Sequence, residues 1–198
     1  MTGRLFTPAE LPPHMPRLRD TWRRKLCRGV LRLTGWSLVG EFPDVPKLVL
    51  IAAPHSSWWD GIWGLLIKAA IGADVHFMAK QELFRGPLGT LLVKLGGMPI
   101  NRGSAQGVVE QMIGQFRQRD RLWLGIAPEG TRRHVPQWKS GFWRIAHGAG
   151  VPVFPVAFNY PDKTIRLGPL FPITDDMVAD MARLRAFYAP FRGKYHGI

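Results

Sequence analysis

The chain has 198 residues, of which 46% are hydrophobic, so it is long enough for one domain with a sizeable core and too apolar for a disordered protein. Its 27 Lys and Arg against 14 Asp and Glu give a net charge of +13, which favours an anionic partner, either nucleic acid or phospholipid headgroups. The single cysteine, Cys27, excludes an internal disulfide and a multi-cysteine metal site, in keeping with a reducing cytoplasm.

Signals for secretion or membrane insertion are weak along the whole chain. Residues 1–20 have no apolar core after their basic residues, so we expect no secretory signal. The most apolar stretch, residues 61–73, is interrupted by Lys68 and is shorter than the roughly 18 residues that a membrane span needs. We therefore expect a peripheral protein at the cytoplasmic face of the membrane, with no transmembrane span.

The N-terminal region divides into a tail and a predicted helix. Residues 1–15 are rich in proline and lack periodicity, which predicts a loosely held tail. From Pro16 to Gly35, apolar residues recur every three or four positions among many arginines, which predicts an amphipathic helix with a basic polar face. Such a helix either docks on an anionic membrane or packs on the domain, and the pattern fits both. We assign residues 1–37 to the tail and helix, and 38–198 to one domain.

Beyond this region, predicted strands and helices alternate. Short apolar runs predict strands at residues 47–53, 74–80, 98–102, 121–128, 151–158 and 164–171. Longer segments of helical periodicity predict helices at 59–72, 86–96, 107–119, 140–150 and 175–191. This alternation indicates an α/β fold, a single domain with a mainly parallel sheet covered by helices on both faces.

A histidine and an aspartate follow the first of these strands. His55 comes directly after it, and Asp60 falls in the first turn of the next predicted helix, from which it can reach back to the imidazole. A carboxylate on one ring nitrogen fixes the tautomer and raises the basicity of the other, as a general base requires. The spacing alone arises often by chance, so an ordinary polar turn is the alternative.

Candidate phosphate-binding residues stand at three other strand ends. Arg102 closes the strand at 98–102, and the strand at 121–128 runs into Glu129, Gly130, Thr131 and Arg132. Arginine beside the N–H groups of a glycine turn suits a phosphate, although a solvated turn with Glu129 paired to an arginine fits as well. Lys80, at the end of another strand, is a further candidate, for which an exposed lysine is the favoured interpretation.

Four segments together carry a more specific signal than any one of them. HSSWWD (55–60), GGMPINR (96–102), PEGTR (128–132) and VPVFPVAF (151–158) stand in the order and near the spacing of the four motifs of the glycerolipid acyltransferases. The chain therefore resembles the family of lysophosphatidic acid and glycerol-3-phosphate acyltransferases over about residues 38–170. The resemblance implies a glycerol-3-phosphate acyltransferase-like fold and makes residues 38–198 an acyltransferase domain.

The resemblance also implies a reaction and residue roles. A fatty acyl group would pass directly from a thioester, either acyl-CoA or acyl carrier protein, to 1-acylglycerol-3-phosphate or another lysolipid or hydroxyl acceptor. His55 resembles the family's general base, and Asp60 the carboxylate that orients it. The acceptor's phosphate and glycerol would be bound by Arg102, Glu129, Gly130, Thr131 and Arg132, with Lys80 as a weaker candidate. This chemistry needs no metal and no cofactor.

The partners expected on this basis are an anionic phospholipid surface, the acyl donor and a lysophospholipid. A nucleic-acid-binding domain is the alternative from a different class, since its charge would meet phosphates and its tryptophans would stack on bases. No helix-turn-helix, RRM or KH signature supports it, so we expect no nucleic acid. Trp58, Trp59 and Trp63, beside the proposed base, either line an acyl-chain entrance or pack in the core, and core packing is favoured.

Overall fold

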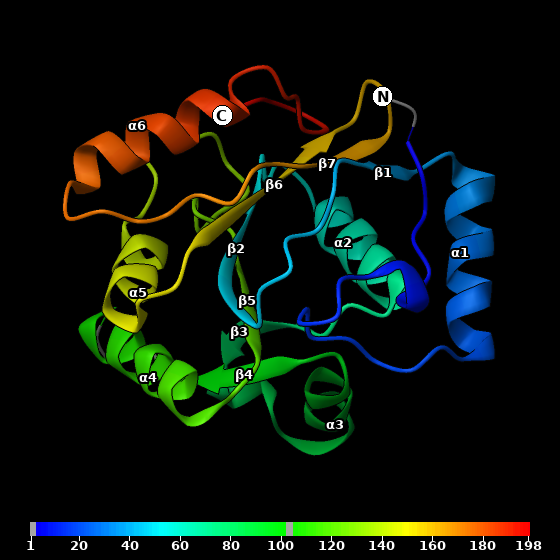
Figure 1. Cartoon of the computed structure of the whole chain (residues 1–198), viewed down its shortest axis with the longest axis horizontal. Coiled ribbons are helices and arrows are strands. Elements are labelled where there is room, and N and C mark those ends of the chain that lie inside the picture. Colours follow the sequence, from blue (N-terminus) through cyan, green and yellow to red (C-terminus); the bar gives the residue numbers. More distant parts are fainter. Residues whose placement is uncertain (1–2, 102–104) are drawn as a thin grey trace.

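A computed structural model describes residues 3–101 and 105–198 (Figure 1). Among these residues, seven strands form one sheet in the order β1-β7-β6-β2-β5-β3-β4. The pairing is parallel throughout except between β6 and β7, which confirms the predicted, mainly parallel sheet. The strands are β1 (Ser37–Val39), β2 (Lys47–Ala53), β3 (Val75–Lys80), β4 (Gly97–Ile100), β5 (Leu122–Ile126), β6 (Val153–Asn159) and β7 (Thr164–Leu167).

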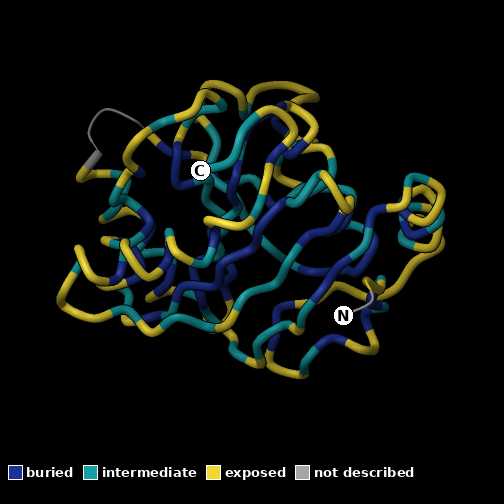
Figure 2. Tube along the Cα trace, turned by 90° about the horizontal axis from the view of Figure 1, so that it is seen from above, coloured by how far each residue is buried: buried dark blue, intermediate teal, exposed yellow. Residues whose placement is uncertain are grey.

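Helices cover both faces of this sheet, as predicted. The α-helices are α1 (Trp22–Thr34), α2 (Trp58–Ile71), α3 (Gly86–Lys94), α4 (Ala105–Gln118), α5 (Gly141–Ala149) and α6 (Met177–Tyr188), and the short 3₁₀ helices are η1 (Pro8–Glu10) and η2 (Gln81–Leu83). Alternate residues of β2 point to opposite faces: Val49 and Ile51 join a core cluster with α4, α5 and α6, whereas Leu48 joins a second cluster with α2. In Figure 2 the buried segments run through the strands at the centre.

The sequence missed one strand. β1 follows α1 after only two residues and pairs with β7 at the edge of the sheet. Three residues are too few to establish an alternating pattern, so nothing in the sequence separates this strand from the end of the helix. The other predicted strands and helices of the domain form close to their predicted positions, with differences of a few residues at the ends.

Two predictions for the N-terminal region are wrong. The tail is packed rather than loose, because Phe6, Leu11 and Met15 are buried in the cluster on the α2 side of the sheet. The helix begins at Trp22 instead of Pro16. Before it, the Leu18 N–H donates to Gly72 and the Asp74 N–H to Pro16, so these backbone groups bond across the chain instead of within a helix.

Helix α1 packs on α2 through part of its basic side. The Arg28 guanidinium is buried and donates to the carbonyl of Ala70 at 2.7 Å and to both carboxylate oxygens of Asp20 at 3.0 and 3.2 Å. Arg24 donates to the carbonyl of Ala69 at 2.8 Å. These carbonyls lie in the last turn of α2, where backbone acceptors lack helical partners and cations are favoured. Arginines therefore dock α1 on the domain.

The apolar stripe of α1 faces mostly outward. Leu31 is fully buried, but Trp22, Leu26 and Leu33 are 69%, 62% and 90% exposed. Figure 1 shows α1 at the outer edge of the molecule beside α2. The helix is thus packed on the domain and still presents large apolar side chains to the surroundings. No helix in the described part of the chain is long and apolar enough to span a membrane.

A buried tyrosine ties the sheet to α6 just before the first motif. The Tyr188 hydroxyl donates to the carbonyl of Ile51 at 2.6 Å and accepts the N–H of Val156 at 3.0 Å. It therefore bridges β2 and β6 four residues ahead of His55, which fixes the direction in which the chain leaves the sheet.

Candidate active site

The loop that carries His55 is held by the start of α2. Ser57 is the N-cap of the helix, and its hydroxyl accepts the N–H of Trp59 at 3.1 Å. Asp60, three residues on, accepts the N–H of Ser57 at 2.7 Å, which completes a capping box. The sequence Ser-x-x-Asp therefore stops β2 from continuing and starts α2 within a few residues. Asp60 lies in the first helical turn, as predicted.

The Asp60 carboxylate is buried and surrounded by donors. Its Oδ2 atom accepts the backbone N–H groups of Ser56 and Ser57, both at 2.7 Å. Its Oδ1 atom accepts the Tyr160 hydroxyl at 2.5 Å and the Ser57 hydroxyl at 3.1 Å. A buried carboxylate is costly unless hydrogen bonds replace water, and here four donors do so.

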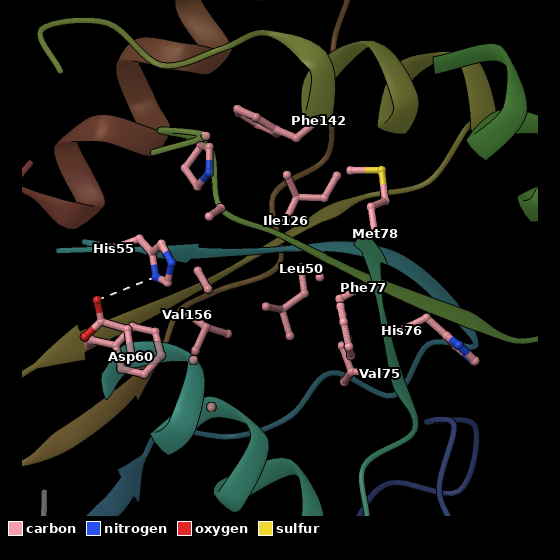
Figure 3. Close-up of a pocket in the computed structure, with 18 of the residues that line it drawn as sticks. Leu50, His55, Asp60, Val75, His76, Phe77, Met78, Ile126, Phe142 and Val156 are labelled. Carbon is pink, nitrogen blue, oxygen red and sulfur yellow. Dashed lines mark ion pairs between the residues drawn. The ribbon is translucent and has the colours of Figure 1, made fainter. Parts of the chain in front are cut away.

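His55 stands beside this carboxylate with part of its ring in the cavity. Its Nδ1 atom lies 3.5 Å from Asp60 Oδ2, the contact that the dashed line marks in Figure 3. Burial lowers the pKa of His55 and outweighs the opposing effect of Asp60, while the charge of Arg132 lowers the pKa further. The imidazole is therefore neutral at neutral pH. With Nδ1 facing the carboxylate, the Nε2 lone pair is the one available to accept a proton.

Glu129 has a role that the sequence did not predict. Its buried carboxylate accepts the backbone N–H of His55, with Oε1 at 3.0 Å and Oε2 at 3.2 Å. Burial raises the pKa of Glu129 to about 7. The third motif thus holds the backbone of the first, although the two residues lie 74 positions apart and no local pattern links them.

Tyr160 is a site residue that the sequence analysis missed. It follows β6 directly, and its hydroxyl donates to Asp60. Burial and this hydrogen bond raise its pKa, so Tyr160 keeps its proton and remains a donor. β6 is the neighbour of β2 in the sheet, so the rule that active groups gather at strand ends would have found it.

The glycine turn after β5 brings a cation to the same place. Gly130 adopts the left-handed conformation, with φ of 64°, and its N–H donates to the carbonyl of Ala127 at 3.1 Å. The Arg132 guanidinium lies over the ring of Trp58, 3.4 Å from its centre. Thr131 accepts the N–H of Arg133 at 3.3 Å. Gly130, Thr131 and Arg132 line the same cavity as His55.

Two further binding candidates were predicted, Arg102 and Lys80. Arg102 lies outside the described residues. Lys80 ends β3 as an exposed residue and is not among those that line the cavity. The favoured core position is wrong for Trp58 and Trp59, which are 76% and 45% exposed, whereas Trp63 packs partly buried between neighbouring rings.

A large, mostly apolar cavity begins at His55 and Asp60. Its volume is about 1530 Å³, and Figure 3 shows its lining on both sides of the strands. The reason is a fork in the sheet: β3 pairs with β5 only as far as Phe77 and Gly125, then continues beside β4 to Lys80. β5 instead stays with β2 as far as Ile126.

We name the two parts of the cavity by the helices that cover them. The α2-side arm is lined by Leu50, Gly64, Val75 and Val156, and the α5-side arm by Met78, Val108, Ile126 and Phe142. Both arms lead to the carboxyl ends of β2 and β5, where His55 and Arg132 lie. This is the usual position of a ligand site in an open parallel sheet.

A family model described as Acyltransferase matches residues 42–159. This range is more than half of the chain, and it contains His55, Asp60, Glu129, Arg132 and most of the sheet. The chain belongs to the acyltransferase family. The resemblance carried by the four motifs is thereby confirmed.

Curated relatives of this acyltransferase share one name, 1-acyl-sn-glycerol-3-phosphate acyltransferase. The protein from Neisseria meningitidis is 31% identical over 75% of this chain and 59% of its own length. The one from Neisseria gonorrhoeae is 30% identical over 62% of this chain and 48% of its own. The Escherichia coli K12 protein is 34% identical over 35% of this chain and 29% of its own. The chain therefore spans less than two-thirds of each of these relatives.

A solved structure shares the fold. The 1-acyl-sn-glycerophosphate (LPA) acyltransferase PlsC from Thermotoga maritima superimposes with a TM-score of 0.55 at 20% identity. The match covers 86% of this chain and 79% of that one. It supports the architecture of the acyltransferase domain as predicted from the sequence.

The raised pKa of Glu129 predicts a pH-dependent stability. Because the folded protein holds the Glu129 proton more tightly than the unfolded chain, this group stabilises the fold below pH ~4.5, and the contribution is lost as the pH rises to ~7. The Glu129→Gln variant keeps an acceptor for the His55 N–H but does not ionise. We therefore compare the unfolding free energy of the variant with that of the wild type at each pH. Between pH ~4.5 and ~7 we expect the variant to become more stable relative to the wild type, by about 3 kcal/mol.

Urea denaturation at a series of pH values measures this difference. Glu41→Gln, at an exposed glutamate, is the matched control and is expected to follow the wild type at every pH. Parallel curves for Glu129→Gln and wild type would contradict the assigned pKa.

Proposed function

We propose that this acyltransferase moves a fatty acyl group from a thioester to the free hydroxyl of 1-acylglycerol-3-phosphate, giving phosphatidate. The observation that carries the proposal is the convergence of His55, Asp60 and Arg132 at the end of a large apolar cavity. A base, a cation for a phosphate and room for acyl chains are what this reaction needs. The shared name of the curated relatives supports the choice of acceptor.

In this proposal His55 is the general base. Its Nε2 atom takes the proton of the acceptor hydroxyl as that oxygen attacks the thioester carbonyl carbon. A C–O bond forms and the C–S bond breaks, and the imidazolium returns the proton to the leaving thiolate, so no acyl-enzyme is needed. Asp60 lies beside Nδ1 at 3.5 Å and favours the tautomer that leaves Nε2 free.

The donor is a thioester of acyl-CoA or acyl carrier protein, and its chain occupies the α2-side arm. This arm starts beside Asp60 and is lined by Leu50, Val75 and Val156, which offer no hydrogen bonds to an alkyl chain. Gly64 widens it, since a Cβ there would meet the Phe158 ring at 3.6 Å. Neither the transfer nor the binding of either substrate requires a metal or a cofactor in this mechanism.

Arg132 and the turn at Gly130 bind the acceptor's phosphate. The Arg132 side chain is fixed by the ring of Trp58, so its charge is positioned before the substrate arrives. The left-handed turn at Gly130 brings a second cation beside this site, because a Cβ on Gly130 would lie only 2.9 Å from the Nζ atom of Lys139.

The protein works at the surface of an anionic membrane, on which α1 docks. Trp22, Leu26 and Leu33 form an exposed apolar stripe, and Arg23 and Lys25 stand exposed beside it. Burying a leucine side chain contributes about 1.5–3 kcal/mol, and each basic residue near anionic headgroups about 1 kcal/mol. Both substrates are anionic amphiphiles, so this position brings the site to where they are concentrated.

Removal of the base tests the mechanism. We expect His55→Ala to lower kcat/KM by roughly 10²–10⁴ with the fold intact, since a positioned general base is worth that factor. Because the pKa of His55 is lowered, wild-type kcat/KM should be level near neutral pH and fall only below the ordinary imidazole pKa of about 6.5. Asp60→Asn should lose less activity than His55→Ala but more stability, because the amide cannot accept all four donors.

Initial rates with purified, folded variants across a pH series decide the point. His55 would be excluded as the base if His55→Ala kept wild-type turnover. It would also be excluded if kcat/KM of the variant fell at acidic pH in the same way as that of the wild type.

Loss of the cation tests the acceptor site. Arg132→Ala should raise KM for the phosphate-bearing acceptor by about ten- to a hundredfold, because a charge-assisted hydrogen bond contributes about 1.5–3 kcal/mol. Arg117→Ala, at an exposed arginine of α4 that does not line the cavity, is the control and should change KM much less. A change in KM for the acyl donor alone would show that Arg132 serves the other substrate.

Membrane docking is tested on α1. The triple variant Trp22→Ser, Leu26→Ser and Leu33→Ser should reduce sedimentation with anionic liposomes at least about tenfold at physiological salt. Changing Arg23 and Lys25 to glutamine should weaken binding mainly at low salt, since exposed charges are screened over about 8 Å in physiological salt. Arg24 and Arg28 are left intact because they hold α1 on α2.

Val178→Ser, at an exposed apolar residue of α6, is the control for the loss of surface hydrophobicity. Equal binding to neutral and anionic liposomes, or no loss in the triple variant, would reject the docking role. Binding to single-stranded DNA that persists in all these variants would point to the nucleic-acid alternative.

A further inference from the structure

The cavity has two arms, and the proposed reaction joins two amphiphiles that each carry an acyl chain. We infer that the α5-side arm binds the acyl chain that the acceptor already carries, while the donor's chain lies in the α2-side arm. The inference rests on the proposed function and adds a second lipid-chain site to it. A lysophospholipid acceptor would then be bound in a protein groove at both its phosphate and its chain.

The size and lining of the cavity fit two chains. At about 1530 Å³ it exceeds the roughly 300–1,000 Å³ of a pocket for one drug-sized ligand. The α5-side arm offers Met78, Val108, Ile126 and Phe142, from β3, α4, β5 and α5, so an alkyl chain would meet apolar groups on every side. These four side chains, like those named for the α2-side arm, offer no hydrogen bonds to an alkyl chain.

Charge distinguishes the two arms. The α5-side arm opens beside Arg132, Lys139 and Arg144, and Lys139 folds over the glycine turn, where a Cβ on Gly130 would lie 2.9 Å from its Nζ atom. The α2-side arm opens beside the buried anion of Asp60. Its cation, Lys68, stands eight residues further along α2 and donates to the carbonyl of Leu95 at 2.5 Å.

The chemistry of the two substrates matches this difference. In 1-acylglycerol-3-phosphate the phosphate and the esterified chain are attached to one glycerol, so they need a cationic group next to an apolar groove. In a thioester the chain starts at the reacting carbonyl, with no charge near it. The fork between β3 and β5 lets both arms open at His55, so the acceptor hydroxyl and the thioester carbonyl reach the base from opposite faces of the sheet.

The test varies the length of the acceptor's chain. Wild-type kcat/KM is measured with 1-acylglycerol-3-phosphates of increasing chain length, as monomers, with one donor and without vesicles. We expect kcat/KM to rise about fourfold per added methylene until the arm is full, the factor that corresponds to ~0.8 kcal/mol per buried CH₂. Val108→Phe, which narrows the α5-side arm, should lower the ratio of kcat/KM for long over short acceptors by about tenfold.

Three further variants make the result specific. Met78→Phe narrows the same arm from the sheet and should lower the same ratio, which covers the case that Val108→Phe fails to fold. Gly64→Leu, in the α2-side arm, should keep the acceptor ratio and shift the preference among donor chain lengths. Val93→Phe makes the same exchange as Val108→Phe at an exposed valine of α3 and should keep the wild-type ratio.

The inference is overturned if wild-type kcat/KM does not depend on the acceptor's chain length, or depends on it only when vesicles are present, which would leave that chain in the lipid. It is also overturned if Gly64→Leu changes the ratio of kcat/KM for long over short acceptors while Val108→Phe and Met78→Phe do not. That result would place the acceptor's chain in the α2-side arm. An enzyme that transfers no acyl group to any of these acceptors would instead refute the proposed function.

Discussion

The candidate site depends on one buried carboxylate. Asp60 accepts hydrogen bonds from the backbone of the loop after β2, from the N-cap serine of α2 and from Tyr160 after β6. Two neighbouring strands and one helix are thus joined at a single charge, and His55 stands beside it. Four donors replace the water that the Asp60 carboxylate loses on burial. The charge that orients the imidazole also holds the loop that carries it.

Glu129 complements Asp60 from the other neighbouring strand. It fixes the backbone of His55, whereas Asp60 acts on the ring, so the histidine is held at both ends, by the turn after β5 and by the first turn of α2. Asp60 has many donors, but Glu129 has few and its pKa rises to about 7. The strand order places β5 and β6 on either side of β2, and this order brings Glu129 and Tyr160 to the loop that carries His55 and Asp60.

Much of this arrangement could be predicted from sequence, because it follows from local patterns. The alternation of strands and helices predicted the parallel sheet, and the helical range at 59–72 placed Asp60 in the first turn of α2. The contact of Glu129 with the His55 backbone could not be predicted, because it depends on strand order across 74 residues. The packed tail was missed because Phe6, Leu11 and Met15 fill gaps without any period. The sequence did not decide whether the apolar stripe of α1 packs on the domain or faces outward, because apolar periodicity does not say what covers a stripe.

The arginines that dock α1 have a geometric consequence. They hold the carbonyls at the C-terminal end of α2, whereas Asp60 lies in the first turn of the same helix. Ala70 and Asp60 are ten residues apart, about 15 Å along a helix at 1.5 Å per residue. Helix α2 is therefore a rigid spacer between the point where α1 is anchored and the pair of His55 and Asp60. A surface that α1 lies on would therefore stand at a distance from His55 that does not vary, because one unbroken helix joins the two places.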